Sequence, residues 1–167
     1  KTLDVQQHFP IGMTKKRNMF IEVYRAFVLS LAWLRLGNPD EAERQATQAL
    51  RLAELPTGLN SSSSATLAPL LAAIAWERGN DVAAHALLTP LLSMIDDVCP
   101  ADGVSLCYRI LARRAHLNGQ RSEAQALLMH AEQLSLRRGW WRTRIALLAE
   151  RVKLLQEAGE THGTRQA

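Results

Sequence analysis

The sequence contains few aromatic residues, few cysteines and no long apolar run. Aromatic residues make up 5% of the 167 residues, whereas 47% are hydrophobic. The core must therefore be built mainly from aliphatic side chains, and alanine and leucine are the most prominent among them. Both residues favour helices, and alanine allows neighbouring helices to approach closely. The composition predicts a single helical domain with a sizeable core.

Cys99 and Cys107 are the only cysteines, and they form no C-x-x-C motif. Two such thiols cannot build a disulfide scaffold, so the sequence predicts a protein of a reducing cytoplasm. The longest apolar run, at 67–76, is too short to cross a bilayer and contains Pro69. No signal peptide is visible, and we expect no membrane contact. Because the chain begins at Lys1, we expect it to be part of a longer protein.

Neither positive nor negative charge dominates the sequence. The chain has 20 basic and 16 acidic residues, which give a formal net charge of +4. A surface of mixed charge permits an anionic partner but does not require one. An RNA-binding repeat would need a recurring basic stripe, which the sequence lacks.

A repeat of about 40 residues is the most informative feature of the sequence. Four glycines are separated by 42, 40 and 40 residues, and a leucine stands eight positions before each of the first three. The next residue is small in each unit, and an alanine follows each of these three glycines after five positions. The positions are Gly37, Gly79, Gly119 and Gly159; Leu29, Leu71 and Leu111; Ser30, Ala72 and Ala112; and Ala42, Ala84 and Ala124. A fixed period of this length predicts a repeat array.

Each unit is predicted to be a helical hairpin that turns at its glycine, which takes a left-handed conformation at low cost. Pro39 suits the first turn of a second helix, and Asp81 and Ser122 are predicted N-caps. The alanines five positions after the glycines should lie where the two helices come close. The predicted helices are 16–36, 39–54, 64–78, 81–96, 103–118, 121–137 and 141–158.

These helices predict an all-α fold, a right-handed superhelix of three hairpins and a closing helix. The repeats would cover about 16–56, 62–98 and 103–138, followed by the closing helix 141–158. Residues 1–15 would form a lead-in segment and residues 159–167 a C-terminal tail.

The first helices of such hairpins line a concave face, which is the predicted binding groove. It would combine rings with cations, and could hold a small anionic inducer or an acidic peptide. The alternative is that the rings pack against neighbouring helices and the arginines are only solvated. The predicted groove residues are Tyr24, Phe27, Leu31, Leu34, Arg35, Thr66, Pro69, Ala73, Trp76, Glu77, Leu106, Arg109, Arg113, His116 and Leu117.

The segment "LRRGWWRTRI" at 136–145 looks at first like a nucleic-acid contact. Gly139 is better interpreted as the end of a helix. Trp141 would start a core stripe through Ile145, Leu148, Val152 and Leu155, which leaves Trp140 as the more exposed ring. An exposed patch of Trp140, Arg142 and Arg144 would remain for a partner.

No catalytic or metal-binding constellation emerges. The histidines are scattered, and Cys107 lies on an apolar stripe, which predicts a buried structural thiol. Asp96 and Asp97 end a predicted helix and are expected to face solvent. The basic run 15–17 is interpreted as a solvated lead-in. The sequence therefore predicts a protein that is not an enzyme and has no metal site.

The repeat resembles the tetratricopeptide pattern. Its leucine-small pairs and its turns "GNPDEA", "GNDVAA" and "GQRSEA" match that pattern, although the period exceeds the usual length of about 34 residues. A narrower resemblance covers about residues 20–160. The final segment, "AEQLSLRRGWWRTRIALLAERVKLLQEAGE", is the most specific part of it. Its Ala-Glu pair, Arg-Gly-Trp corner and Ala-Glu-Arg-Val sequence are similar to the helical repeats of MalT-like, LuxR-type transcriptional regulators.

That resemblance implies a sensor domain that binds an inducer or a protein partner. The family places an ATP-dependent switch before the repeats and a DNA-binding helix-turn-helix after them. Neither is visible here, since the chain has no phosphate loop. No cofactor is therefore expected in this chain, with ATP and DNA bound only by domains outside it. A stand-alone adaptor for protein partners is the alternative, and self-association into a homo-oligomer stays open.

Overall fold

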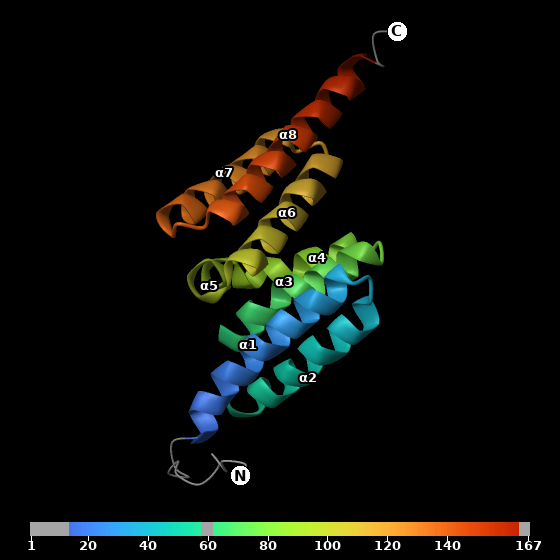
Figure 1. Ribbon diagram of the computed structural model, residues 1–167. Coiled ribbons are helices and arrows are strands. Elements are labelled where there is room, and N and C mark those ends of the chain that lie inside the picture. Colours follow the sequence, from blue (N-terminus) through green and yellow to red (C-terminus); the bar gives the residue numbers. More distant parts are fainter. Residues whose placement is uncertain (1–13, 58–61, 164–167) are drawn as a thin grey trace, which may run out of the picture.

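The computed structural model describes residues 14–57 and 62–163, and all regular structure within these ranges is helical (Figure 1). The first hairpin consists of α1 (Thr14–Arg35) and α2 (Pro39–Thr57). In the second, α3 (Ser62–Glu77) is followed by α4 (Asp81–Leu88), the short 3-10 helix η1 (Thr89–Leu91) and α5 (Leu92–Val98). The third consists of α6 (Ala101–Leu117) and α7 (Arg121–Arg137), and α8 (Trp141–Gly163) closes the array. The predicted all-α fold of helical hairpins is confirmed.

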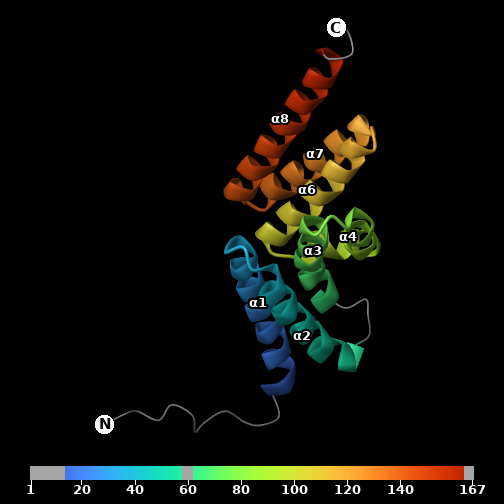
Figure 2. The ribbon, with the colours of Figure 1, turned by 90° about the vertical axis from the view of Figure 1, so that its right-hand side faces the viewer.

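The first helices of successive units pack side by side. Helix α1 contacts α3, α3 contacts α6, and α6 contacts α8. Figure 2 shows the resulting stack, which rises from α1 and α2 through α3 and α4 to α6, α7 and α8. Such an array buries each unit only against its neighbours. The right-handed sense of the superhelix stays a prediction.

Four turns have the same backbone geometry. At Gly79, the N–H donates to the Trp76 carbonyl at 2.9 Å, and the Asn80 N–H donates to the Ala75 carbonyl at 2.9 Å. This is a Schellman motif, in which a left-handed residue lets the last carbonyls of a helix find donors. The same pair of bonds recurs at the other turns, and φ is positive at Gly37, Gly79, Gly119 and Gly139. The predicted role of these glycines is confirmed.

The N-caps differ from the prediction in two units. The N-cap of α4 is Asn80, whose Oδ1 accepts a hydrogen bond from the Ala83 N–H at 3.0 Å. Asp81 lies one position inside the helix. In α7 the N-cap is Gln120, which makes no side-chain cap bond, and Ser122 lies in the first turn. The predicted caps Asp81 and Ser122 are therefore wrong, because each lies inside its helix and not at the position before it.

Small residues meet where the two helices of a hairpin come close. The alanines five positions after the turn glycines are fully or almost fully buried, as are the small residues of the preceding helices. These are Ala42, Ala84, Ala124, Ser30, Ala72 and Ala112. Their burial agrees with the predicted close approach of the paired helices.

Two helix boundaries depart from the prediction. The helix predicted at 81–96 is divided, since Pro90 lacks an N–H and its ring opposes a continuous α-helix. The closing helix runs to Gly163 and not to 158, so the fourth turn predicted at Gly159 is wrong. A Cβ placed on Gly159 would touch nothing within 4 Å, so packing does not require a glycine at this position.

The core face of α8 is the opposite of the predicted one. The apolar stripe that begins at Trp141 is exposed, whereas the buried positions of α8 are Thr143, Leu147, Glu150 and Leu154. Trp140 was expected to be the exposed ring, but it is half-buried and packs against the core. The two tryptophans have exchanged their predicted roles because α8 turns a mixed face toward α6 and α7.

Candidate ligand groove

Two hollows that meet at Asp102 form the candidate groove. The aromatic hollow has a volume of about 400 Å³ and lies among α1, the start of α6 and the turn before α8. Its rings are Phe20, Tyr24 and Trp140. The charged hollow has a volume of about 300 Å³ and is bounded by α1, α3, α6 and α8. Its lining includes Arg35, Glu77, Leu106, Arg109 and Ala146. These are the first helices of the units, where the sequence placed the groove.

The aromatic hollow offers apolar area at its mouth. Phe20 and Tyr24 lie one helical turn apart and stack with their ring centroids 6.5 Å apart. Both side chains are exposed. Trp140 comes from the turn before α8, and the Arg138 guanidinium lies 5.0 Å from its ring centroid. Exposed rings that face a hollow are the anchors that binding sites use most often.

The charged hollow is balanced and not cationic. Arg35 donates a hydrogen bond to Asp102 at 2.7 Å, and Arg109 donates to Glu150 at 3.1 Å. Glu77 adds another carboxylate to the lining. The arginines are thus already paired, which argues against a ligand chosen only for negative charge. A ligand carboxylate would have to compete with Asp102 for Arg35.

Glu150 is a buried charge that joins α6 to α8. It is 4% exposed. Its Oε2 accepts from Arg109, and its Oε1 lies 2.5 Å from Arg113 Nε without hydrogen-bond alignment. Two half-exposed guanidinium groups offset the cost of burying one carboxylate. Glu150 could not be recognised from the sequence, because nothing in α8 alone shows which residues of α6 will face it.

The structure brings together only part of the predicted groove. The predicted positions that line the hollows are Tyr24, Leu31, Leu34, Arg35, Thr66, Glu77, Leu106 and Arg109. Phe27 is 2% exposed and belongs to the core, so its predicted place in the groove is wrong.

Other predicted groove positions do not line either hollow. Trp76 is half-buried against the core. On α6, Arg113 faces Glu150, and His116 Nε2 lies 3.7 Å from Glu157 Oε2. These residues therefore pack or form ion pairs within the fold and do not line a ligand site.

The predicted patch beside the last turn is divided. Trp140 lines the aromatic hollow, whereas Arg142 is exposed and Arg144 lies 5.7 Å from the centroid of the Trp141 ring. Trp140 therefore belongs to the groove, and the two arginines belong to the surface of α8.

Asp96 contributes to a polar cluster that the sequence analysis missed. Tyr108 donates a hydrogen bond to Asp96 Oδ1 at 2.8 Å, and His130 Nε2 lies 2.7 Å from Oδ2. Burial, together with the bond to Asp96, raises the pKa of Tyr108 above its usual range. The expectation that Asp96 faces solvent is wrong because its carboxylate is held between α6 and α7. This cluster ties three helices together and lies outside both hollows.

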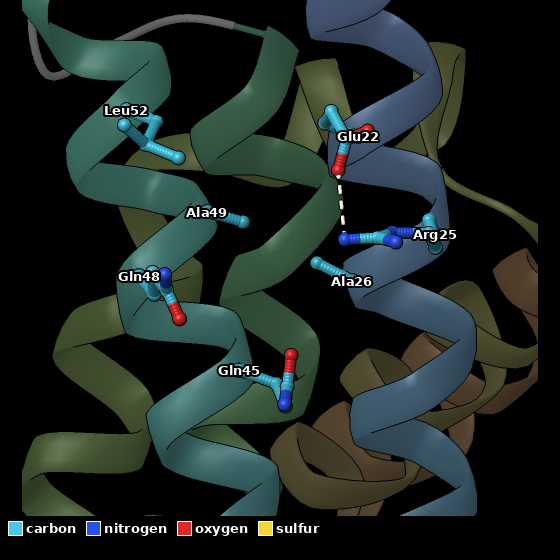
Figure 3. Close-up of a pocket in the computed structure, with 7 residues that line it drawn as sticks. All are labelled: Glu22, Arg25, Ala26, Gln45, Gln48, Ala49 and Leu52. Carbon is cyan, nitrogen blue, oxygen red and sulfur yellow. Dashed lines mark ion pairs between the residues drawn. The ribbon is translucent and has the colours of Figure 1, made fainter.

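A third, smaller cleft lies between α1 and α2 (Figure 3). Its volume is about 80 Å³, and its lining includes an ion pair of 3.1 Å between Glu22 and Arg25. Ligand pockets usually measure about 300 Å³ or more. This cleft can hold water but is too small for an inducer.

The two cysteine thiols are poorly suited to act as nucleophiles. Burial raises the pKa of the Cys99 thiol to about 12 and that of Cys107 further still, so neither forms a thiolate near neutral pH. The confirmed burial of Cys107 agrees with a structural thiol. Among the described residues, no group of three histidine, cysteine or acidic side chains could hold a metal ion. None of the described helices combines the length and the apolarity that crossing a membrane requires.

No family model, curated protein or solved structure matches this chain.

Proposed function

We propose that this chain is a non-catalytic binding domain that takes an inducer or a partner segment in the groove between α1, α3, α6 and α8. The observation that carries this proposal is that a hollow lined by three aromatic rings shares Asp102 with a charged hollow on the first helices of the array. The rings supply apolar area. Arg35 and Asp102 supply a polar pair that can exchange partners when a ligand arrives.

The resemblance to MalT-like, LuxR-type regulators supports a sensor role. A groove bounded by four helices from different units changes shape when the units shift relative to one another. A ligand that binds one arrangement more tightly would bias the array toward it, and flanking ATP-binding and DNA-binding domains would respond. An upstream phosphate loop and a downstream helix-turn-helix in the same gene would support this role, whereas their absence would favour an adaptor for protein partners.

A thermal-shift screen tests the groove. Metabolites, nucleotides and short peptides would be added to the wild-type chain. A ligand present at about a hundredfold of its Kd should stabilise the fold by about 2.7 kcal/mol. For a chain of this size that corresponds to a rise in Tm of roughly 5–10 °C.

A pair of variants on α1 shows whether a hit occupies the groove. Tyr24→Ala removes an exposed ring from the aromatic hollow, so it should reduce the thermal shift without lowering the Tm of the free protein by much. Val28→Ala changes another exposed residue of α1 that is not part of either hollow, and it should leave the shift intact. A hit that is unaffected by Tyr24→Ala, or equally reduced by both changes, would contradict the groove assignment.

A further inference from the structure

Helix α8 presents an unpartnered apolar face, which we name the α8 stripe. Its members recur at intervals of four and three residues, so they form one continuous face of the helix. All of them are exposed, and Val152 at its centre is 53% exposed. The stripe consists of Trp141, Ile145, Leu148, Val152 and Leu155.

The repeat period shows what kind of element fits this face. Forty positions before Leu148, Val152 and Leu155 stand Tyr108, Ala112 and Ala115 of α6, and all three are buried. Helix α7 packs closely on α6, and the Tyr108 ring lies 5.2 Å from the ring of His130 in α7. The α8 stripe thus stands in the register of an α6 face that contacts α7 at Tyr108. By this equivalence, the element that fits the stripe is a helix running antiparallel to α8.

The edges of the stripe indicate the charge of that helix. Arg144 lies along one edge, and Arg142 and Lys153 lie along the other, as the helical spacing requires. No ion pair engages these three cations within the part of the chain that the structure describes. The acidic residues Glu150 and Glu157 of α8 face α6. A second copy of α8 would place cations against cations, whereas an acidic helix would pair with them.

From register and charge together, we propose that the α8 stripe binds an amphipathic helix of a partner protein, with an apolar face and acidic edges. This surface is separate from the groove, so the proposal does not depend on the groove binding a ligand. The contact would pair two amphipathic helices, with apolar anchors at three- and four-residue spacing supplying most of the affinity.

Peptide binding tests the proposal. The probe is a labelled synthetic helix with leucines at three- and four-residue spacing and glutamates along both edges. Its matched control has the same leucines and lysines in place of the glutamates. Fluorescence anisotropy should show that the acidic peptide binds the wild-type chain at least about tenfold more tightly than the basic one. Its affinity should also fall as salt is added.

Two valine variants locate the contact. Val152→Glu introduces a charge at the centre of the stripe and should weaken binding of the acidic peptide by about tenfold or more. Val82→Glu introduces the same charge at an exposed valine of α4 and should leave binding unchanged, since Val82 is 65% exposed and far along the array. Because both side chains are exposed, circular dichroism should show that both variants stay folded.

Three results would overturn the proposal. The first is no binding of the acidic peptide at about 100 µM, and the second is equal binding of both peptides. The third is self-association of the wild-type chain in sedimentation equilibrium that Val152→Glu abolishes, which would assign the stripe to a second copy. Loss of binding in Val152→Glu alone, with Val82→Glu unchanged, supports the partner helix.

Discussion

At the residue scale, the two cysteine thiols show how tightly the core is packed. Cys99 and Cys107 are buried, and Gly103 lies so close to Cys99 and Phe27 that an added Cβ would collide with the sulfur. The start of α6 can therefore approach α1 only because residue 103 has no side chain. The same tight packing removes water from the thiols and raises the pKa of both.

These pKa shifts predict a loss of stability at high pH. The unfolded thiols lose their protons near pH 9, whereas the folded Cys99 keeps its proton to about pH 12. The stabilisation is complete below pH 9 and declines as the pH rises from 9 toward 12. Between pH 8 and pH 10, each thiol should lower the free energy of unfolding by about 1.4 kcal/mol.

Urea unfolding at the two pH values measures this loss. The control is a Cys99→Ala/Cys107→Ala variant, which has no thiols but keeps the other groups that titrate in this range. The wild-type chain should lose more stability than the variant on going from pH 8 to pH 10. An equal loss in both proteins would show that the thiols are not the cause.

At the scale of the element, the close approach of paired helices depends on single alanines. Ala124 is buried where α7 meets α6, whereas Ala126 of the same helix is exposed. Ala124→Leu should force the helices apart and lower the free energy of unfolding by about 1–3 kcal/mol. Ala126→Leu adds the same side chain on the surface, and its effect should stay within about 0.5 kcal/mol.

Chemical denaturation of both variants measures the difference. Similar values for the two would mean that the hairpin tolerates a large side chain at its turn, and the repeated alanine would then need another explanation.

The elements were predictable from the sequence where local rules decide them. The rule that a glycine ends a helix and the rule that a small residue marks a close helix contact both depend on residues only a few positions apart. The turns and the hairpins could therefore be located from the sequence. Faces were harder. The α8 periodicity identifies an apolar stripe, but it does not say whether a partner helix exists to cover it. In this chain the more polar face with Thr143 and Glu150 packs instead, because arginines from α6 neutralise Glu150.

The location of the two hollows was predictable to the same extent. The period placed Tyr24, Arg35, Glu77 and Arg109 on the first helices, where the hollows are found. It did not reveal that the arginines would already be paired, because Asp102 and Glu150 come from other units. Pairing between units depends on how far each helix is shifted along its neighbour, which sequence spacing alone does not define.

At the scale of the whole molecule, contacts join mainly neighbouring units, and Glu150 is the main charge link between α6 and α8. Glu150→Gln keeps the shape of the side chain but leaves Arg109 and Arg113 without their shared counter-charge. Because both arginines are partly exposed, we expect the stability of the last units to fall by about 1–3 kcal/mol, less than for a fully buried pair.

Hydrogen exchange shows how far this loss spreads. In a repeat array a local weakness stays near its origin, so the amides of α8 should exchange faster in Glu150→Gln while those of α1 and α2 keep their protection. Glu22→Gln, which breaks an exposed pair with Arg25 in α1, is the control and should change little. Faster exchange in every helix would contradict the array picture. It would mean that the units unfold as one cooperative block, and a ligand in the groove could then act on α8 only by stabilising the whole chain.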